Sequence, residues 1–360
     1  MLALSSNSSE TMCDDAHGAN VHNDETKKDC ESIAASSVYS DTPCLSSTNK
    51  YVVILMGLPA SGKSTVAGHL INFLGINCST ETLRCKTFNA GDYRRKASAL
   101  ELASNPSDDV FNPKNSEKKD KFARLAFSDA LQSLNNDSCD LALFDATNST
   151  TKRREYLFNE INSFNTNPSA RYTITPLVFD VTCTNKSMIR YNIHRKAYNN
   201  DYADKVYDAA IKDFTKRLQQ YQSQYVPYTV SEFRSYDNYE QLEKLQLSNG
   251  SFYFHVGNAG RDQPSNQLEF TPHVSGETAK VVHSIDYFTS HYYMMYGRIY
   301  LTKVHEFFSI PRVISANKFN WPKTKEHMHR LMLLHRIVDR SFVKSLDDFV
   351  NVSTIISYSN

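Results

Sequence analysis

The stretch GLPASGKST at residues 57–65 constrains the fold of this chain more than any other feature. It matches the pattern G-x-x-x-x-G-K-[ST], in which backbone N–H groups wrap around the phosphates of a nucleotide. The apolar run YVVILM before it predicts a buried strand, and apolar side chains at helical spacing predict a helix over 63–74. Because this context directs loop amides and a helix N-terminus at one anion, we expect the chain to bind a nucleoside triphosphate.

Strands and helices alternate along the chain after this loop. Apolar runs predict strands at 85–91, 141–148, 173–183, 252–257 and 298–304, and helical periodicity predicts helices at 116–134, 151–163, 185–197, 204–223 and 278–296. The alternation indicates an α/β fold of the P-loop NTPase type, with a mostly parallel sheet and helices on both faces. An amphipathic stripe over 324–350 predicts a C-terminal helical extension, which packs within the monomer or forms a homodimer contact.

The first fifty residues differ in composition from the rest. They contain ten serines, and three lysines against eight acidic residues give a net charge of −5. Such a segment has too little apolar surface to offset the entropy of ordering it, so we predict a disordered tail whose serines are open to phosphorylation. The chain is therefore divided into a tail (1–50), a P-loop domain (51–304) and a C-terminal extension (305–360).

Composition also excludes several classes of protein. The net charge is +1, and the residues after the tail carry +6, which is small for a dedicated nucleic-acid binder. No apolar run approaches the roughly 18 to 20 residues of a membrane span, and the N-terminus lacks the pattern of a secretory signal. Seven cysteines without CxxC spacing are typical of free thiols in a reducing compartment. We therefore predict a cytoplasmic protein that binds neither nucleic acid nor a membrane.

The residue types in the loop and at the next strand end suit phosphoryl transfer. Lys63 can reach the β- and γ-phosphates of the nucleotide, and the Ser64 hydroxyl can join the shell of a Mg²⁺ ion. Asp145 ends the predicted strand in FDATN, where it can bind Mg²⁺ through water or orient an attacking hydroxyl group. The alternative for Asp145 is a helix cap, a role that Thr147, Asn148 and Ser149 could also fill.

Two arginine pairs follow strand ends. Arg94 and Arg95 come after the strand at 85–91, and Arg153 and Arg154 after the strand at 141–148. Guanidinium groups match phosphate oxygens in a bidentate way, so these pairs favour an acceptor that carries its own phosphate. Each pair could instead lie on a solvated helix face.

Four blocks, in this order and spacing, resemble a known family: GLPASGKST, FNAGDYRR (88–95), FDATNSTTKRR (144–154) and KDFTKRLQQYQSQYVP (212–227). They are similar to the kinase domain of the 6-phosphofructo-2-kinase/fructose-2,6-bisphosphatase family, over about residues 51–304. The resemblance implies ATP-dependent phosphorylation of the 2-hydroxyl of fructose 6-phosphate, which gives fructose 2,6-bisphosphate, with Mg²⁺ as the cofactor.

The resemblance also assigns roles to individual residues. The ATP loop comprises Gly57, Leu58, Pro59, Ala60, Ser61, Gly62, Lys63, Ser64 and Thr65, with a further ATP contact at Asn192. Catalytic positions fall on Lys63, Asp145, Cys183 and Lys196, of which Lys196 faces both substrates. Contacts to fructose 6-phosphate fall on Arg94, Thr147, Arg153, Lys196, Arg217 and Tyr221. A small buried thiol is the alternative reading of Cys183.

The chain departs from the family at two places. One family arginine on the helix after FNxGxYRR lacks a clear match, and Arg124 is the nearest candidate, with Lys121 behind it. In bifunctional relatives the strand after the kinase domain ends in Arg-His-Gly, whose histidine takes up phosphate. Here Val304 stands in the place of that histidine, and 56 residues follow it. We therefore expect a kinase-only member of the fungal type, with no phosphatase domain and no bisphosphatase activity.

Two other functions stay open at this point. A kinase of another acceptor, such as a polynucleotide 5′-hydroxyl, predicts a basic groove with stacking aromatic residues, which a charge of +6 supports poorly. A non-catalytic sensor of nucleotide and sugar phosphate is the second alternative. The presence of Lys63, Ser64 and Asp145 together favours an enzyme over a sensor.

Overall fold

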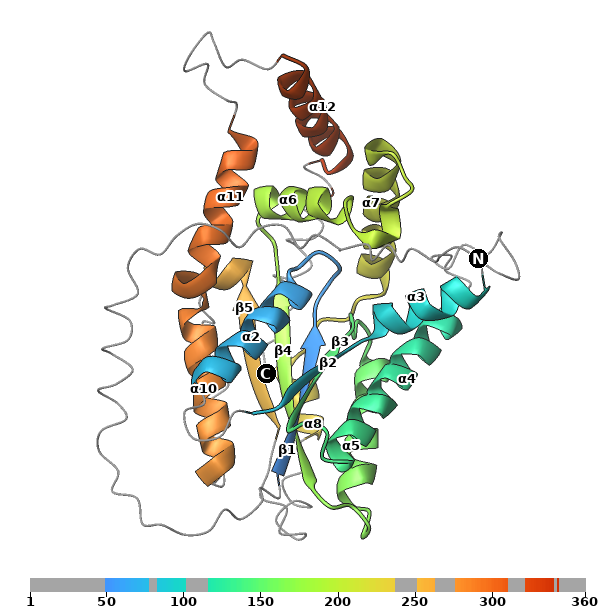
Figure 1. The fold of residues 1–360 in the computed structure, drawn as a ribbon, viewed down its shortest axis with the longest axis vertical. Coiled ribbons are helices and arrows are strands. Elements are labelled where there is room, and N and C mark those ends of the chain that lie inside the picture. The colour runs from blue at the N-terminus through green and yellow to red at the C-terminus, as the bar shows by residue number, and fades with distance from the viewer. Residues whose placement is uncertain are drawn as a thin grey trace, which may run out of the picture. The chain divides into compact units, whose positions relative to one another are not determined.

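The computed structural model describes residues 49–77, 83–101, 116–236, 251–262, 276–309, 321–339 and 342. Within these residues a sheet runs in the order β2-β3-β1-β4-β5, and every pair of neighbouring strands is parallel (Figure 1). The strands are β1 (Asn49–Met56), β2 (Cys85–Asn89), β3 (Leu141–Asp145), β4 (Thr173–Thr182) and β5 (Phe252–Gly257). The predicted parallel sheet is confirmed, and β1 begins two residues before the predicted strand.

Helices cover both faces of the sheet, as predicted. Tyr51, Val53 and Leu55 of β1 pack on one face against α2 (Lys63–Asn77) and α10 (Gly276–Tyr292). The alternate residues of β1 pack on the other face against α4 (Ser116–Asn135), α5 (Thr151–Asn165) and α8 (Val230–Tyr236). A strand with both faces buried needs apolar residues without interruption, which explains the run YVVILM.

Further helices lie beyond the carboxyl ends of the strands. α3 (Ala90–Glu101) follows β2 directly, and no helix was predicted there. α6 (Lys186–Lys196), the 3-10 turn η2 (Asn200–Tyr202) and α7 (Tyr207–Gln224) follow β4, beside the ends that the arrowheads in Figure 1 mark. Because all strands are parallel, their carboxyl ends meet at this one edge of the sheet.

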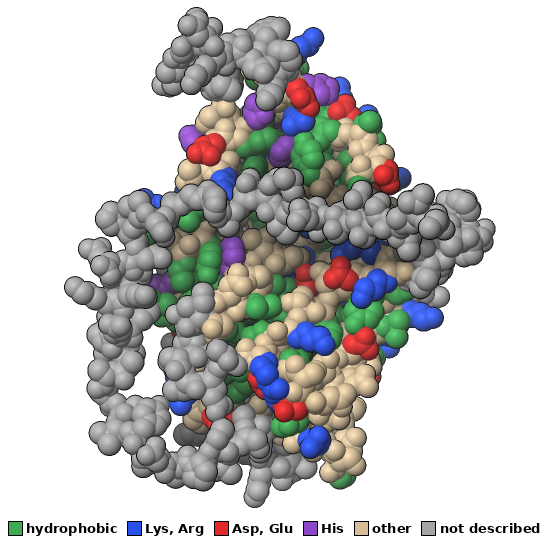
Figure 2. All heavy atoms as spheres, in the orientation of Figure 1, with side chains coloured by type: hydrophobic (Ala, Val, Ile, Leu, Met, Phe, Trp, Pro, Cys, Tyr) green, Lys and Arg blue, Asp and Glu red, His purple; other side chains and the backbone are tan. Residues whose placement is uncertain are grey.

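The C-terminal extension packs on α6 and α7 within the chain. α12 (Trp321–Ile337) buries Leu333 and Leu334 against Ile193 and Leu218. On the face shown in Figure 2, histidines gather over this part of the molecule, where the His327 ring contacts the Phe307 carbonyl at 3.0 Å. The helix predicted over 324–350 thus ends at residue 337, and the end of that range, 343–350, lies outside the described residues.

The strand predicted at 298–304 is wrong. Helix α10 continues through a π-helical turn, η4 (Tyr293–Gly297), into α11 (Arg298–Phe308) without a break. Val304 is therefore buried on a helix and does not stand at a strand end. Gly297 lies where η4 meets η3 (Asn258–Gly260), and a Cβ atom on it would approach the Ala259 carbonyl oxygen to 2.0 Å.

The predicted tail lies outside the described residues, except for its last two positions. Lys50 is a buried member of β1, and its ammonium group donates to Asp137 at 2.6 Å and to Asp140 at 2.5 Å. Ordered structure thus begins before the predicted boundary at residue 51. Cys85, Cys139 and Cys183 are free thiols. Over the described ranges, no helix combines the length and the apolar character that crossing a membrane requires.

Candidate active site

A cavity of about 1220 Å³ lies at the carboxyl edge of the sheet, between the loop after β1 and helices α3, α6, α7 and α11. Most of the predicted site residues line it: Pro59, Ala60, Gly62, Lys63, Ser64, Thr65, Arg94, Asp145, Thr147, Arg153, Asn192, Lys196, Arg217 and Tyr221. Of the other predicted residues, Gly57, Leu58, Ser61, Arg124, Lys121 and Cys183 are not part of the lining. The structure therefore brings residues predicted to bind ATP and residues predicted to bind the acceptor to one cavity.

The loop has the tight backbone that a phosphate cradle requires. Gly57 and Gly62 have φ values of +129° and +106°, in a region that side chains strongly disfavour. A Cβ atom on Gly57 would lie 2.2 Å from the Val181 carbonyl oxygen, so β4 leaves no room for a side chain there. Ala60 adopts φ +63° without being glycine, which makes the tip of the loop a strained position.

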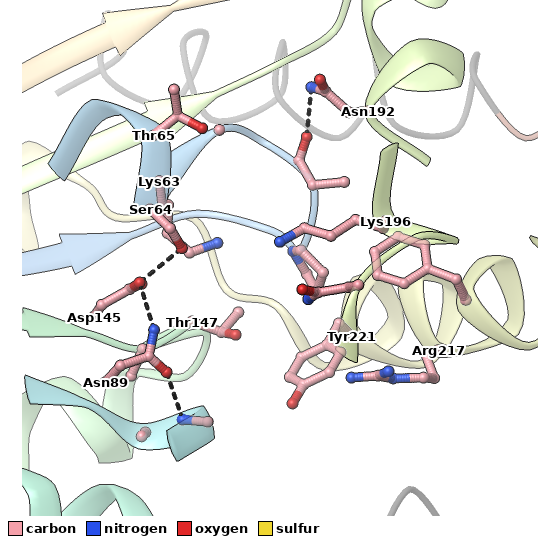
Figure 3. Close-up of a pocket in the computed structure, with 18 of the residues that line it drawn as sticks. Lys63, Ser64, Thr65, Asn89, Asp145, Thr147, Asn192, Lys196, Arg217 and Tyr221 are labelled. Atoms are coloured by element: carbon pink, nitrogen blue, oxygen red, sulfur yellow. Dashed lines mark hydrogen bonds between the residues drawn. The ribbon is translucent and has the colours of Figure 1, made fainter. Parts of the chain in front are cut away.

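Lys63 is folded against the loop from which it emerges. Its Nζ donates to the carbonyl oxygens of Gly57 at 2.8 Å and Leu58 at 2.7 Å, and the side chain is only 8% exposed. Burial lowers the pKa of Lys63 to about 8; nearby Asp145 opposes this shift and Lys196 adds to it. Lys63 and Lys196 extend their ammonium groups toward each other across the cavity, as Figure 3 shows. This arrangement suits a polyanion between them.

Asp145, at the end of β3, is hydrogen-bonded to one residue of α2 and one residue of β2. Its Oδ2 accepts hydrogen bonds from Ser64 Oγ at 2.7 Å and from Asn89 Nδ2 at 2.8 Å (Figure 3). Asn89 is its neighbour in the β2–β3 register, and its own Oδ1 accepts from the Gly91 amide at 2.7 Å. Sequence analysis missed Asn89, although the strand-end rule that identified Asp145 applies to it equally. The predicted alternative for Asp145 is wrong, because Thr150 caps α5.

The pair of Ser64 and Asp145 fits a Mg²⁺ ion. Mg²⁺ prefers oxygen ligands and is usually held by one or two carboxylates together with water and phosphate oxygens. A hydroxyl and a carboxylate oxygen 2.7 Å apart, beside a phosphate-binding loop, supply that donor set. Ser64 and Asp145 are thus the residues that would hold the ion.

Asn192 ties the tip of the loop to α6. Its Nδ2 donates to the Ala60 carbonyl at 2.8 Å, and its Oδ1 accepts from the Tyr300 hydroxyl at 2.7 Å. Tyr300 comes from α11 and also lines the cavity. Sequence analysis missed Tyr300, because the segment that contains it was predicted to be a strand.

The arginines of α3 and α7 meet at one carboxylate, that of Asp201 in η2. Arg94 Nη2 donates to both carboxylate oxygens of Asp201, at 2.9 and 2.8 Å, and Arg95 and Arg217 lie at 3.4 and 3.8 Å. Burial alone would raise the pKa of the Asp201 carboxyl. The positive charges of Arg94, Arg217 and Arg95 lower it by more, so the pKa of Asp201 lies below its ordinary value. Sequence analysis missed Asp201, because the sequence shows it only as an acidic residue between two predicted helices.

Lys196 and Tyr221 complete this side of the cavity. Burial lowers the pKa of the Lys196 ammonium; Asp145 and Asp201 oppose this, while Arg217 and Arg95 strengthen it. Tyr221 lies one turn after Arg217 on α7, and both side chains line the cavity (Figure 3). Lys196 therefore stands between the loop and the arginines.

Arg153 reaches the cavity from α5, whereas Arg124 does not. Arg153 Nε donates to Asp120 at 2.8 Å, and Arg153 is only 16% exposed. Arg124 contacts the same carboxylate at 2.5 Å, but it lies over the Tyr156 ring, outside the cavity lining. The structure therefore gives no support to Arg124 as a contact for the acceptor, and Lys121 is also outside the lining.

Arg154, the second member of its pair, has a structural position. It is fully buried, and its Nε and Nη2 each donate to the Glu232 carboxylate at 2.7 Å. Its Nη1 also donates to the backbone carbonyls of Asn148 at 3.1 Å and Val226 at 2.9 Å. Arg154 thus holds α5, α8 and the loop after β3 together. Arg154 therefore lies neither at the cavity nor on a solvated helix face, which are the two positions that the sequence left open for this pair.

Cys183 is partly buried and is not part of the cavity lining. Its thiol lies among the apolar groups beneath the loop and α6, including Leu58, Ile189 and Tyr300. Burial raises the pKa of the Cys183 thiol to about 12. A thiol with such a pKa stays protonated and is a poor nucleophile. These observations favour the alternative reading, a small buried thiol.

Comparisons with known proteins agree on one family. The family model described as 6-phosphofructo-2-kinase matches residues 40–249. "6-phosphofructo-2-kinase 1" of Saccharomyces cerevisiae is 30% identical over 184 residues, which cover 50% of this chain and 21% of that protein. A probable 6-phosphofructo-2-kinase of Schizosaccharomyces pombe is 32% identical over 191 residues, covering 51% and 26%. The chain thus matches about a quarter of the length of these curated relatives.

Among solved structures, one described as "Crystal Structure of Fungal RNA Kinase" aligns with 80% of this chain and 98% of its own length. The identity is 11% and the TM-score is 0.36. A superposition at that level carries no argument about fold or function.

Proposed function

The chain belongs to the 6-phosphofructo-2-kinase family, and on this premise we propose that it transfers the γ-phosphoryl group of ATP to the 2-hydroxyl of fructose 6-phosphate. One observation carries the proposal: a nucleotide loop with its paired Ser64 and Asp145 faces an arginine cluster across the same cavity. The loop suits ATP, and guanidinium groups suit an acceptor that already carries a phosphate. A kinase whose acceptor lacked a phosphate would have no use for Arg94, Arg153 and Arg217 at this place.

The chemistry requires positioning and charge neutralisation more than a strong base. The oxygen of the 2-hydroxyl forms a bond to the γ-phosphorus while the bond from that phosphorus to the β–γ bridging oxygen breaks, so that ADP leaves and the proton of the hydroxyl is released to solvent. Lys63 and the loop amides hold the β- and γ-phosphates, and Lys196 neutralises charge between the substrates. Asp145 stands at the strand end, where it orients the attacking hydroxyl. A bound Mg²⁺ ion would supply further charge neutralisation at Ser64 and Asp145.

Arg94, Arg153, Arg217 and Tyr221 hold the sugar phosphate in this proposal. They come from α3, α5 and α7, so three separate elements fix the acceptor in position. Arginine forks define orientation as well as charge, so in this proposal they hold the sugar with its 2-hydroxyl toward ATP. We assign no chemical step to Cys183.

We also propose that this chain has kinase activity without bisphosphatase activity and acts in the cytosol. Its sequence contains no Arg-His-Gly tripeptide, the motif whose histidine takes up phosphate in bifunctional relatives. The net charge of +1 gives it little attraction for nucleic acid.

The first test is product formation from ATP and fructose 6-phosphate, with an assay that distinguishes phosphate on C2 from phosphate on C1. Lys63→Met should lower kcat by about a hundredfold or more, because it removes a donor aimed at the transferred group. Arg94→Ala should raise KM for fructose 6-phosphate about tenfold to a hundredfold, since it removes charge-assisted hydrogen bonds.

Arg124→Ala is the matched control. It removes the same side chain at an exposed position outside the cavity lining, and it should leave both kinetic constants within about twofold of the wild type. A wild-type protein that binds both ligands but forms no 2,6-product would contradict the proposal and favour a sensor.

A further inference from the structure

The charge on the acceptor side of the cavity is partly cancelled by a single carboxylate. Asp201 is 11% exposed, and Arg94 and Arg217, which lie within 2.8 and 3.8 Å of it, are 14% and 15% exposed. Lys196 lines the same part of the cavity and feels the charge of Asp201. Groups buried to this extent are little screened by solvent, so each unit of charge changes which anion fits.

The charges of the side chains around Asp201 can be counted. Arg94, Arg217 and Lys196 contribute three positive charges, and Asp201 removes one, which leaves two. Arg95 lies 3.4 Å from Asp201 but is also paired with Asp92 on the same helix, and Arg153 is paired with Asp120, so neither of these arginines adds to the sum. A phosphate monoester above its second pKa, about 6, carries two negative charges. The remaining positive charge therefore equals that of the dianion.

We propose that Asp201 is a specificity-determining residue, which sets the charge of the acceptor site so that a dianionic phosphate ester is preferred to more highly charged anions. The inference rests on the proposed function for the identity of the acceptor, but the charge count does not depend on it. Without Asp201 the site would carry three uncompensated positive charges and would suit a trianion better.

Asp201 can lose its charge without loss of the surrounding structure. Arg217 Nη1 also donates to the Tyr202 hydroxyl at 2.9 Å, and that hydroxyl donates to Asp213 at 2.8 Å. Arg95 keeps its pairing with Asp92. Asp201→Asn retains the shape of the side chain, so it changes the charge of the site with little change in packing.

The experiment is direct binding by calorimetry, without ATP, of three probes: sulfate as a dianion, tricarballylate as a trianion and fructose 6-phosphate. At about pH 8 the carboxylates of tricarballylate are ionised, because their pKa values lie near 4. In Asp201→Asn, the affinity for tricarballylate relative to sulfate should rise about tenfold, as expected for one nearby charge. Arg94→Gln removes a positive charge, so it should lower the same ratio.

Two controls accompany these variants. Asp201→Glu keeps the charge, and Asp208→Asn removes a negative charge from α7 at a site that pairs with His329, outside the cavity lining. Both should leave the ratio within about twofold of the wild type. A merely structural role for Asp201 would weaken the binding of all three probes together and leave the ratio unchanged.

The outcomes separate the two proposals. A ratio that is the same in wild type, Asp201→Asn and Arg94→Gln overturns the role of Asp201, even if fructose 6-phosphate binds as expected. If Asp201→Asn does not fold, Asp201→Ser, which also removes the negative charge, decides the question by the same ratio. A shifted ratio in a protein that does not bind fructose 6-phosphate supports the role of Asp201 and contradicts the proposed acceptor.

Discussion

At the scale of single residues, the burial of Lys63 makes ATP binding depend on pH. Its pKa of about 8 in the free protein means that the ammonium group loses its proton as the pH rises through that value. ATP restores the charge, because its phosphates favour the protonated form. We therefore expect kcat/KM for ATP to fall above about pH 8, since this constant reports the free enzyme, while kcat at saturating ATP falls only at higher pH.

The measurement is kcat and kcat/KM for ATP from about pH 6.5 to 10, at saturating fructose 6-phosphate. Lys63→Arg is the control, because a guanidinium group keeps its proton up to about pH 12. Its residual activity should not show the decline. A decline at the same pH in both constants, or one that persists in Lys63→Arg, would assign the titration to another group.

Individual residues also show what the sequence could and could not predict. Residue type and strand-end position were sufficient to identify Lys63, Ser64 and Asp145. They could not distinguish Arg153, which reaches the cavity, from Arg154, which is fully buried. Successive residues on a helix point about 100° apart, so this choice depends on how α5 is rotated against the sheet.

At the scale of elements, α11 holds the nucleotide loop through Asn192. Tyr300→Phe removes only the hydroxyl that donates to Asn192 Oδ1. One such hydrogen bond contributes about 0.5 to 1.5 kcal/mol, so KM for ATP should rise about twofold to tenfold. KM for fructose 6-phosphate should stay unchanged, because its arginines lie on α3, α5 and α7.

Steady-state kinetics with each substrate varied in turn tests this expectation. Tyr287→Phe removes a hydroxyl from the neighbouring helix α10, where the side chain is 41% exposed and outside the cavity lining. It should behave as the wild type. If Tyr300→Phe instead raised both KM values equally, the hydroxyl would serve general stability and not the loop.

The segment that forms α11 was predicted as a strand for a physical reason. RIYLTKV contains β-branched and aromatic residues that favour strands, and seven residues are too few to separate the two periodicities. The inward positions Tyr300, Val304 and Phe307 have helical spacing, but only a longer window shows it. Gly297 follows the helix predicted over 278–296, and its lack of a side chain permits close contact with Ala259. The five other predicted strands overlap β1 to β5. Of these, β1, β3 and β4 are buried on both faces and therefore leave nearly continuous apolar runs.

At the scale of the whole molecule, α12 packs against α6 on the side of that helix that faces away from the active site. Its Leu334 is fully buried against α6, whose other side carries Asn192 and Lys196. Leu334→Ala leaves a cavity in this contact, and we expect it to lower the free energy of unfolding by about 2 to 5 kcal/mol. Urea denaturation followed by circular dichroism measures the loss.

Met332→Ala is the control on the same helix, because Met332 is 69% exposed. Its effect should stay within about 0.5 kcal/mol. Equal unfolding midpoints for wild type and Leu334→Ala would mean that α12 does not unfold together with the sheet.

The order of residues along the chain determines when each part of the cavity is synthesised. The nucleotide loop ends at residue 65, whereas Tyr300, which braces it through Asn192, is made more than two hundred residues later. At roughly 5 to 20 residues per second, the ribosome needs about 10 to 50 s to cover that distance. A ligand stabilises a protein only by binding its folded form. The loop spends that interval without its brace, so we expect ATP to stabilise the nascent chain less until translation has passed α11.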